Sequence, residues 1–98
     1  MRIERVGAAE VRVGGRLGFA EASVALARGR ELLDGTRGDV AVDVAGLEDI
    51  DSATLAVLLA WAAHARQVGA ALHFRGVPAG LAALAHLCDV EPLLAGKA

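Results

Sequence analysis

Few side chains in this sequence are of the types that catalyse reactions or hold metal ions. The chain has one cysteine and three histidines, and Cys88 lies two residues after His86. On a helix that spacing turns the two side chains about 160° apart, so they do not form a thiolate–imidazole pair. The histidines lack the spacing to cysteines or carboxylates that a metal site requires, and no glycine-rich phosphate loop is followed by Lys and Ser or Thr. We therefore expect no enzymatic activity, no metal site and no cofactor.

Ser52 is the side chain with the clearest potential for binding or regulation. It follows Asp51 directly before a long apolar run, and either residue could cap a helix by accepting backbone N–H groups. The alternative is that the Ser52 hydroxyl contacts a partner or is phosphorylated. A phosphate there would meet the N–H groups of the helix start, but it would also lie beside Glu48, Asp49 and Asp51. It would oppose an acidic or apolar partner surface, so we expect phosphorylation to release a partner rather than recruit one.

The elements that would position Ser52 alternate between strands and helices. Polar–apolar alternation on either side of residues 7–9 predicts a short hairpin, and valines at 40, 42 and 44 predict a central strand. Apolar residues spaced by three or four predict helices, which glycine or proline ends. The predicted elements are strands at Arg2–Val6 and Glu10–Val13, a helix at Phe19–Leu33, a strand at Asp39–Val44, a helix from Ser52 to about Val68, a strand at Ala71–Phe74 and a last helix that begins at Gly76-Val77-Pro78, with Pro92 after its end.

This order of elements predicts an α/β fold. A strand, a helix and a further strand imply a parallel pair joined by a crossover, and the N-terminal hairpin makes the sheet mixed. A chain of 98 residues has room for only one hydrophobic core. We therefore expect about four strands and three helices in a single domain over residues 1–98.

The helix that begins at Ser52 carries apolar side chains on both its faces. One face is predicted to pack against the sheet, with Trp61 in the core and its indole N–H bonded to some acceptor. The opposite face is small and apolar where an isolated domain would carry Lys and Glu, which usually marks a binding surface. The alternative is that the first helix or the termini cover this face. The sheet-facing set is Thr54, Val57, Leu58, Trp61, Ala65 and Val68, and the outward set is Leu55, Ala56, Leu59, Ala60, Ala62 and Ala63.

Composition excludes several classes of partner. The chain is 55% hydrophobic and 22% charged, with a net charge of −2. Its ten basic residues are scattered and only 3% of residues are aromatic, so we expect no nucleic-acid partner. The longest uncharged stretch, Ser52–Ala65, is fourteen residues, which is too short to cross a bilayer. We expect no signal peptide and no direct membrane insertion, and the single cysteine fits a cytoplasmic protein.

Three segments of the sequence resemble STAS domains. Val40–Leu59 is similar to the family's signature, in which an apolar strand with an internal aspartate and a loop lead into a leucine-rich helix opened by Asp-Ser. Leu72–Val90 resembles the family's last strand and helix, and Gly15–Ala20 resembles the start of its first helix. The resemblance covers nearly the whole chain, and it implies a STAS fold with a binding role and no enzymatic activity.

Two branches of this family compete. The anti-sigma factor antagonists bind a serine kinase, which phosphorylates the serine that matches Ser52. MlaB-like proteins are subunits of an ABC transporter that moves phospholipids between the bacterial outer and inner membranes and maintains outer-membrane lipid asymmetry. The run Asp51–Trp61 resembles the MlaB-like branch, and Thr54 stands where antagonists commonly have glycine. We therefore favour the MlaB-like branch and keep the antagonist as the alternative.

The resemblance also implies a partner and a contact surface. The expected partner is the cytoplasmic ATPase subunit of the transporter, which could hold this protein at the inner face of the inner membrane; the alternative partner is an anti-sigma factor serine kinase, with Ser52 as its phosphorylation site. The contact would centre on Ser52, and the last helix could extend it. The predicted partner-binding residues are Asp51, Ser52, Leu55, Ala56, Leu59 and Ala63, and the predicted extension is Ala79, Ala82, Ala83 and His86.

Overall fold

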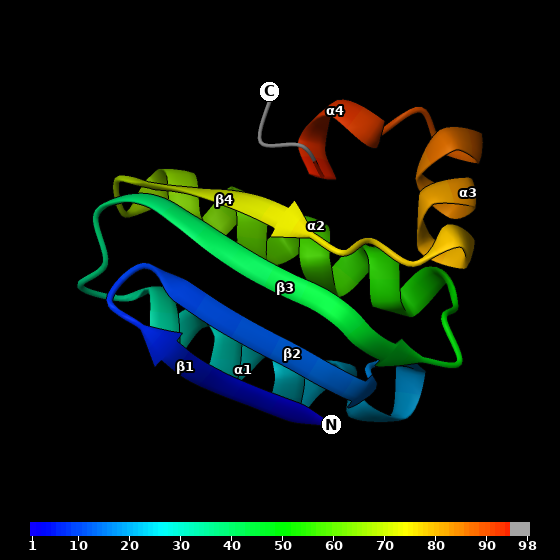
Figure 1. Cartoon of the computed structure of the whole chain (residues 1–98), viewed down its shortest axis with the longest axis horizontal. Helices are drawn as coiled ribbons and strands as arrows, with labels where there is room; N and C mark the ends of the chain where they lie inside the picture. Colours follow the sequence, from blue (N-terminus) through cyan, green and yellow to red (C-terminus); the bar gives the residue numbers. More distant parts are fainter. Residues whose placement is uncertain (95–98) are drawn as a thin grey trace.

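The computed structural model describes residues 1–94, in which strands and helices alternate as the sequence predicts (Figure 1). Every predicted element is present, and most bounds agree within two or three residues. The elements are β1 (Arg2–Gly7), β2 (Glu10–Arg16), the 3-10 helix η1 (Phe19–Glu21), α1 (Ala22–Leu33), β3 (Gly38–Glu48), α2 (Ser52–Gln67), β4 (Ala70–Arg75), α3 (Ala79–Leu87) and α4 (Glu91–Leu94).

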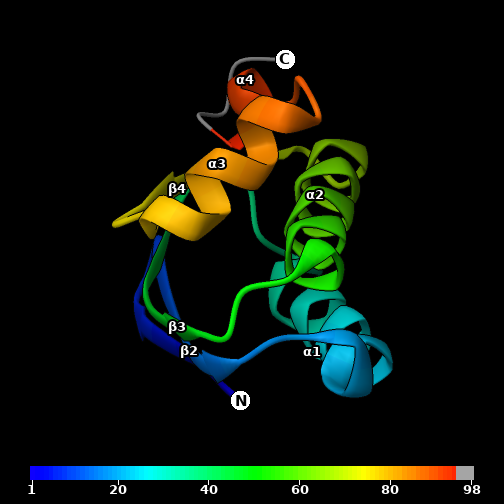
Figure 2. The same ribbon diagram turned by 90° about the vertical axis from the view of Figure 1, so that its right-hand side faces the viewer.

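The four strands form one mixed sheet in the order β1-β2-β3-β4. β1 pairs with β2 antiparallel, while β2 pairs with β3 and β3 with β4 in parallel. Helices α1 and α2 lie side by side on one face of this sheet (Figure 2). α3 and α4 pack against α2 at the β4 edge (Figures 1 and 2). The α/β class, the mixed sheet and the three main helices are therefore confirmed.

One strand boundary differs from the prediction, and one short helix was not predicted. β3 runs on through residues 46–48, beyond its predicted end at Val44, because β2 also continues and pairs with it from Gly14↔Gly46 to Arg16↔Glu48. Pro92 follows the end of α3, as predicted, but it lies in a further short helix, α4, which the sequence did not predict. A proline is tolerated in the first turn of a helix, where its missing N–H would have no helical partner.

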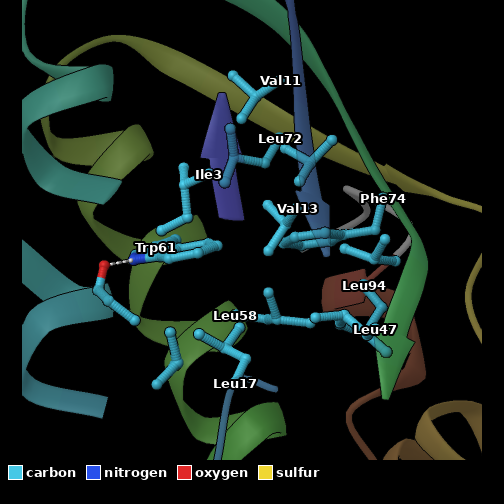
Figure 3. Close-up of a cluster of buried hydrophobic side chains, with 14 of the residues drawn as sticks. Ile3, Val11, Val13, Leu17, Leu47, Leu58, Trp61, Leu72, Phe74 and Leu94 are labelled. Atoms are coloured by element: carbon cyan, nitrogen blue, oxygen red, sulfur yellow. Dashed lines mark hydrogen bonds between the residues drawn. The ribbon is translucent and has the colours of Figure 1, made fainter. Parts of the chain in front are cut away.

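The core lies between the sheet and the two helices that cover it (Figure 3). The predicted sheet-facing residues of α2 are buried, except that Val68 is half-buried. Trp61 is 3% exposed, and its Nε1–H donates to the backbone oxygen of Ala25 in α1 at 3.0 Å (Figure 3). The indole lies directly against Gly29, where an added Cβ would fall 2.1 Å from Trp61 Nε1. Glycine at this position thus lets α1 and α2 approach closely.

The uncovered face of the sheet carries charged side chains. Glu4, Arg12, Asp43 and Arg75 are successive cross-strand partners, so charges of opposite sign alternate across all four strands. Arg12 Nε lies 3.9 Å from Asp43 Oδ2, and Asp43 Oδ1 accepts a hydrogen bond from the backbone N–H of Ala45. Opposite charges at such positions stabilise a sheet modestly and favour a solvated face.

Candidate functional site

The N-terminus of α2 is capped by Asp51 and not by Ser52. The Asp51 Oδ1 accepts the backbone N–H of Thr54 at 2.9 Å, and the Thr54 Oγ1 accepts the backbone N–H of Asp51 at 3.2 Å. These reciprocal bonds satisfy two donors at the start of the helix. Thr54 is fully buried, so its hydroxyl serves the cap and is not part of the surface. The sequence allowed either Asp51 or Ser52 to be the cap, and in the structure it is Asp51.

The same carboxylate also joins α2 to the start of the first helical segment. The pKa of Asp51 lies below its usual value of 3.8, chiefly because the Thr54 backbone N–H donates to it. Partial desolvation opposes this shift, while the Thr54 hydroxyl and the backbone N–H groups of Phe19 and Ala53 add to it. Gly18 makes the approach possible, since a Cβ there would lie 2.9 Å from Asp51 Oδ2. Asp51 thus fixes Ser52 and Phe19 relative to each other.

Ser52 is exposed at the first residue of α2. Within residues 1–94 its hydroxyl makes no hydrogen bond. A donor and an acceptor are therefore available to a partner at the head of the helix. The first N–H groups of α2 that no side chain caps lie beside it.

The outward face of α2 continues from Ser52 as a stripe of small side chains. Ala56 and Ala63 are exposed, and Leu59 is half-buried against the core. Leu55 differs from the prediction, because it is only 4% exposed and belongs to the core. The spacing within α2 does not show which other elements contact this helix, and both α3 and α4 pack against it. We call the exposed residues Ser52, Ala56 and Ala63, together with the half-buried Leu59, the α2 outer face.

The residues of α3 that were predicted to extend the contact lie at the surface. Ala79, Ala82, Ala83 and His86 are all exposed. The sequence analysis did not single out Leu87, which ends α3 and is 80% exposed. An apolar side chain this exposed favours a partner that covers it.

Phe19 was also missed, because the spacing of apolar residues predicted it to be the first residue of a regular helix. Its side chain is 87% exposed. Residues 19–21 form a 3-10 turn rather than the first turn of α1, and the tighter rotation of that turn directs Phe19 away from the core. The available signal was Gly18, which marks a turn directly before it. Phe19 lines an open hollow of about 590 Å³ with Arg16, Gly18, Ala20, Glu21, Asp49 and Asp51.

The histidines take part in surface contacts. His64 Nε2 lies 2.9 Å from Asp34 Oδ1, and His73 Nε2 lies 3.0 Å from Asp39 Oδ1. Cys88 is exposed and is not in a disulfide. Among the residues that the structure describes, no three His, Cys, Asp or Glu side chains are grouped to hold a metal ion. None of the helices in residues 1–94 has the length and apolar character needed to cross a membrane.

A mixed sheet with two helices on one face and an exposed serine at the capped start of the second helix defines a STAS domain. The family model described as "Mlab, STAS domain" matches residues 1–95, and the chain belongs to this family. Among curated proteins, no match reaches significance.

Proposed function

We propose that this chain is a non-enzymatic subunit that binds the cytoplasmic ATPase of an ABC phospholipid transporter and regulates or stabilises it. The transporter would maintain outer-membrane lipid asymmetry. The whole chain would act as one STAS domain in the cytoplasm, held at the inner face of the inner membrane by its partner. Membership in the MlaB-type STAS family supports this proposal.

The observation that carries the proposal is the α2 outer face with its unbonded hydroxyl. Ser52 offers a hydrogen-bonding group, and beyond it Ala56 and Ala63 are exposed where an unpartnered helix would normally carry charges. Small side chains let a helix of the partner approach closely. A permanently docked subunit can keep such a surface covered, whereas a freely diffusing one exposes it to water.

The alternative function is that of an anti-sigma factor antagonist. Ser52 is exposed and its hydroxyl is free within residues 1–94, so a serine kinase could reach it. A phosphate would meet the helix N–H groups favourably but would add charge beside Asp49 and Asp51. The two functions therefore differ in partner and in the covalent state of Ser52.

Affinity capture from the native cell with the full chain as bait distinguishes these functions. An ABC ATPase that copurifies with a permease and a substrate-binding subunit is the expected result. A small serine kinase in the capture, with phosphate on Ser52, would establish the antagonist instead.

Two surface variants test the docking face directly. Ser52→Glu and Ala56→Glu should each weaken copurification of the ATPase at least roughly tenfold, because burial of an unpaired carboxylate costs more than about 1.4 kcal/mol. Leu59→Glu should abolish binding. Because Leu59 is half-buried against the core, that variant also perturbs the fold, so it is a less specific test of the surface. Gln67→Glu, which adds the same charge at the other end of α2, is the matched control. Unimpaired copurification of both surface variants would refute the proposed face.

A further inference from the structure

The hollow beside Phe19 combines an exposed aromatic ring with an excess of carboxylates. Phe19 is 87% exposed, and the hollow of about 590 Å³ is also lined by Glu21, Asp49 and Asp51, with Arg16 as its single cation. An exposed phenylalanine ring in water is unfavourable, and a partner that covers it gains apolar burial. The hollow adjoins the residue before Ser52, so a partner docked on the α2 outer face also meets it.

Part of the charge in this hollow remains available to a partner. Arg16 Nε is 2.7 Å from Asp49 Oδ2, and Glu21 Oε1 accepts the backbone N–H of Gly18 at 3.1 Å. Three carboxylates face one guanidinium, so the hollow attracts a further cation. A second copy of this chain would bring the same negative hollow, so charge disfavours a symmetric self-contact here.

We propose that this hollow receives an arginine side chain of the docked partner protein. Its planar guanidinium would stack on the ring of Phe19 while donating to the carboxylates of Glu21 and Asp49. Lysine fits less well, because its compact ammonium neither stacks on the ring nor bridges two separated carboxylates. The proposal deepens the proposed function and rests on it for the identity of the partner.

Two conservative substitutions remove the charges without removing the local structure. Glu21→Gln keeps an oxygen that can accept the Gly18 N–H, since glutamine also serves in capping boxes. Asp49 has φ of 50°, a left-handed conformation that asparagine tolerates. The double variant E21Q/D49N therefore removes two negative charges while the backbone is retained. Glu31→Gln, in the last turn of α1, is the matched control for loss of charge.

A titration with a small probe tests the hollow independently of any protein partner. Amide chemical shifts of the full chain are followed by NMR as N-acetyl-arginine methylamide is added, with the lysine and norleucine analogues at equal concentration and ionic strength. Shifts centred on Phe19, Glu21 and Asp49 are expected with the arginine compound. They should be several-fold smaller with the other two compounds, in E21Q/D49N and in Phe19→Leu, but unchanged in Glu31→Gln. Absence of localised shifts, or equal shifts with the lysine compound, would overturn the assignment.

Binding to the ATPase of the proposed transporter separates failure of this inference from failure of the proposed function. E21Q/D49N should weaken that complex roughly fivefold, the size expected for two solvent-exposed ion pairs, and should flatten its salt dependence. If the ATPase binds the double variant as tightly as the wild type, the arginine assignment is wrong and the proposed function stands. If the ATPase binds neither protein while the arginine probe still shifts the Phe19 amide, the proposed function is wrong and the cation-binding hollow stands.

Discussion

The close contact between Gly29 of α1 and Trp61 of α2 gives the sharpest test of the packing. In Gly29→Ala the new Cβ would fall 2.1 Å from Trp61 Nε1 and 2.3 Å from its Cε2, far inside van der Waals contact. The indole must therefore move, although it is 3% exposed and bonded to Ala25 O. The adjacent apolar hollow has a volume of about 20 Å³, which is too small to take in a displaced ring.

Three terms set the size of the effect of Gly29→Ala. Alanine is favoured over glycine in a helix by about 1 kcal/mol. Overpacking of a core costs about 1–3 kcal/mol, and a buried indole N–H that loses its acceptor costs about 1–3 kcal/mol more. The net loss in the free energy of unfolding is therefore about 1–5 kcal/mol. A loss of about 3 kcal/mol corresponds to a decrease in Tm of roughly 10–25 °C for a domain of this size.

Thermal and urea denaturation followed by circular dichroism measure this loss. Gly80→Ala in α3 is the matched control, because its new Cβ would meet only Ile50 Cβ at an ordinary 4.0 Å. That control should be neutral or stabilising by up to about 1 kcal/mol. In a double-mutant cycle with Trp61→Phe, the smaller ring should relieve the clash, so the double variant should be at least about 1 kcal/mol more stable than additivity predicts. The reasoning fails if Gly29→Ala raises Tm as Gly80→Ala does.

Three further substitutions test the turns and the cap. Gly76→Ala should lower the free energy of unfolding by about 2–5 kcal/mol, because Gly76 has φ of 67° and its new Cβ would lie 2.8 Å from Ala45 Cβ. Gly35→Ala, at φ of 85° with open space around it, should lower the free energy of unfolding by only about 1–2 kcal/mol. Equal losses for Gly76→Ala and Gly35→Ala in urea denaturation would contradict the steric contribution of the contact with Ala45. The lowered pKa of Asp51 means that its ionised form stabilises the fold above the unfolded value of 3.8, and that this stabilisation is lost as the pH falls through the folded pKa. The Tm of the wild type should therefore exceed that of Asp51→Asn by a constant amount near neutral pH, and this difference should shrink below about pH 4. A difference that persists in strong acid would contradict this account.

Local patterns predicted the elements well because the signals that define them lie within each element. The alternating valines of β3 and the sheet-facing stripe of α2 depend only on periods of two and of 3.6 residues. The parallel pairing followed from the order of elements, because a crossover helix separates the strands. The same reasoning predicted that Trp61 would be buried with a bonded N–H, which Ala25 O satisfies.

The site was less predictable because its exposure depends on contacts between elements. Leu55 lies on the face of α2 that the sequence predicts to point outward, but it is only 4% exposed in the structure. Phe19 was predicted to begin the first helix, yet residues 19–21 form a 3-10 turn and its side chain is 87% exposed. Neither effect is encoded in the period of one helix. Both require knowledge of which elements meet at the start of α2.

The division of roles between Asp51 and Ser52 explains why two polar residues stand together at this helix start. If Ser52 were the cap, its hydroxyl would accept a hydrogen bond from a backbone N–H and would not be available to a partner. Because Asp51 accepts from Thr54, the serine moves one position into the helix and its hydroxyl points to no internal group within residues 1–94. The same carboxylate lies against Gly18 and lines the aromatic hollow, so loss of Asp51 should disturb the α2 outer face and the hollow together. A binding defect in Asp51→Ala should accordingly exceed that of Ser52→Ala, although Asp51 need not touch the partner.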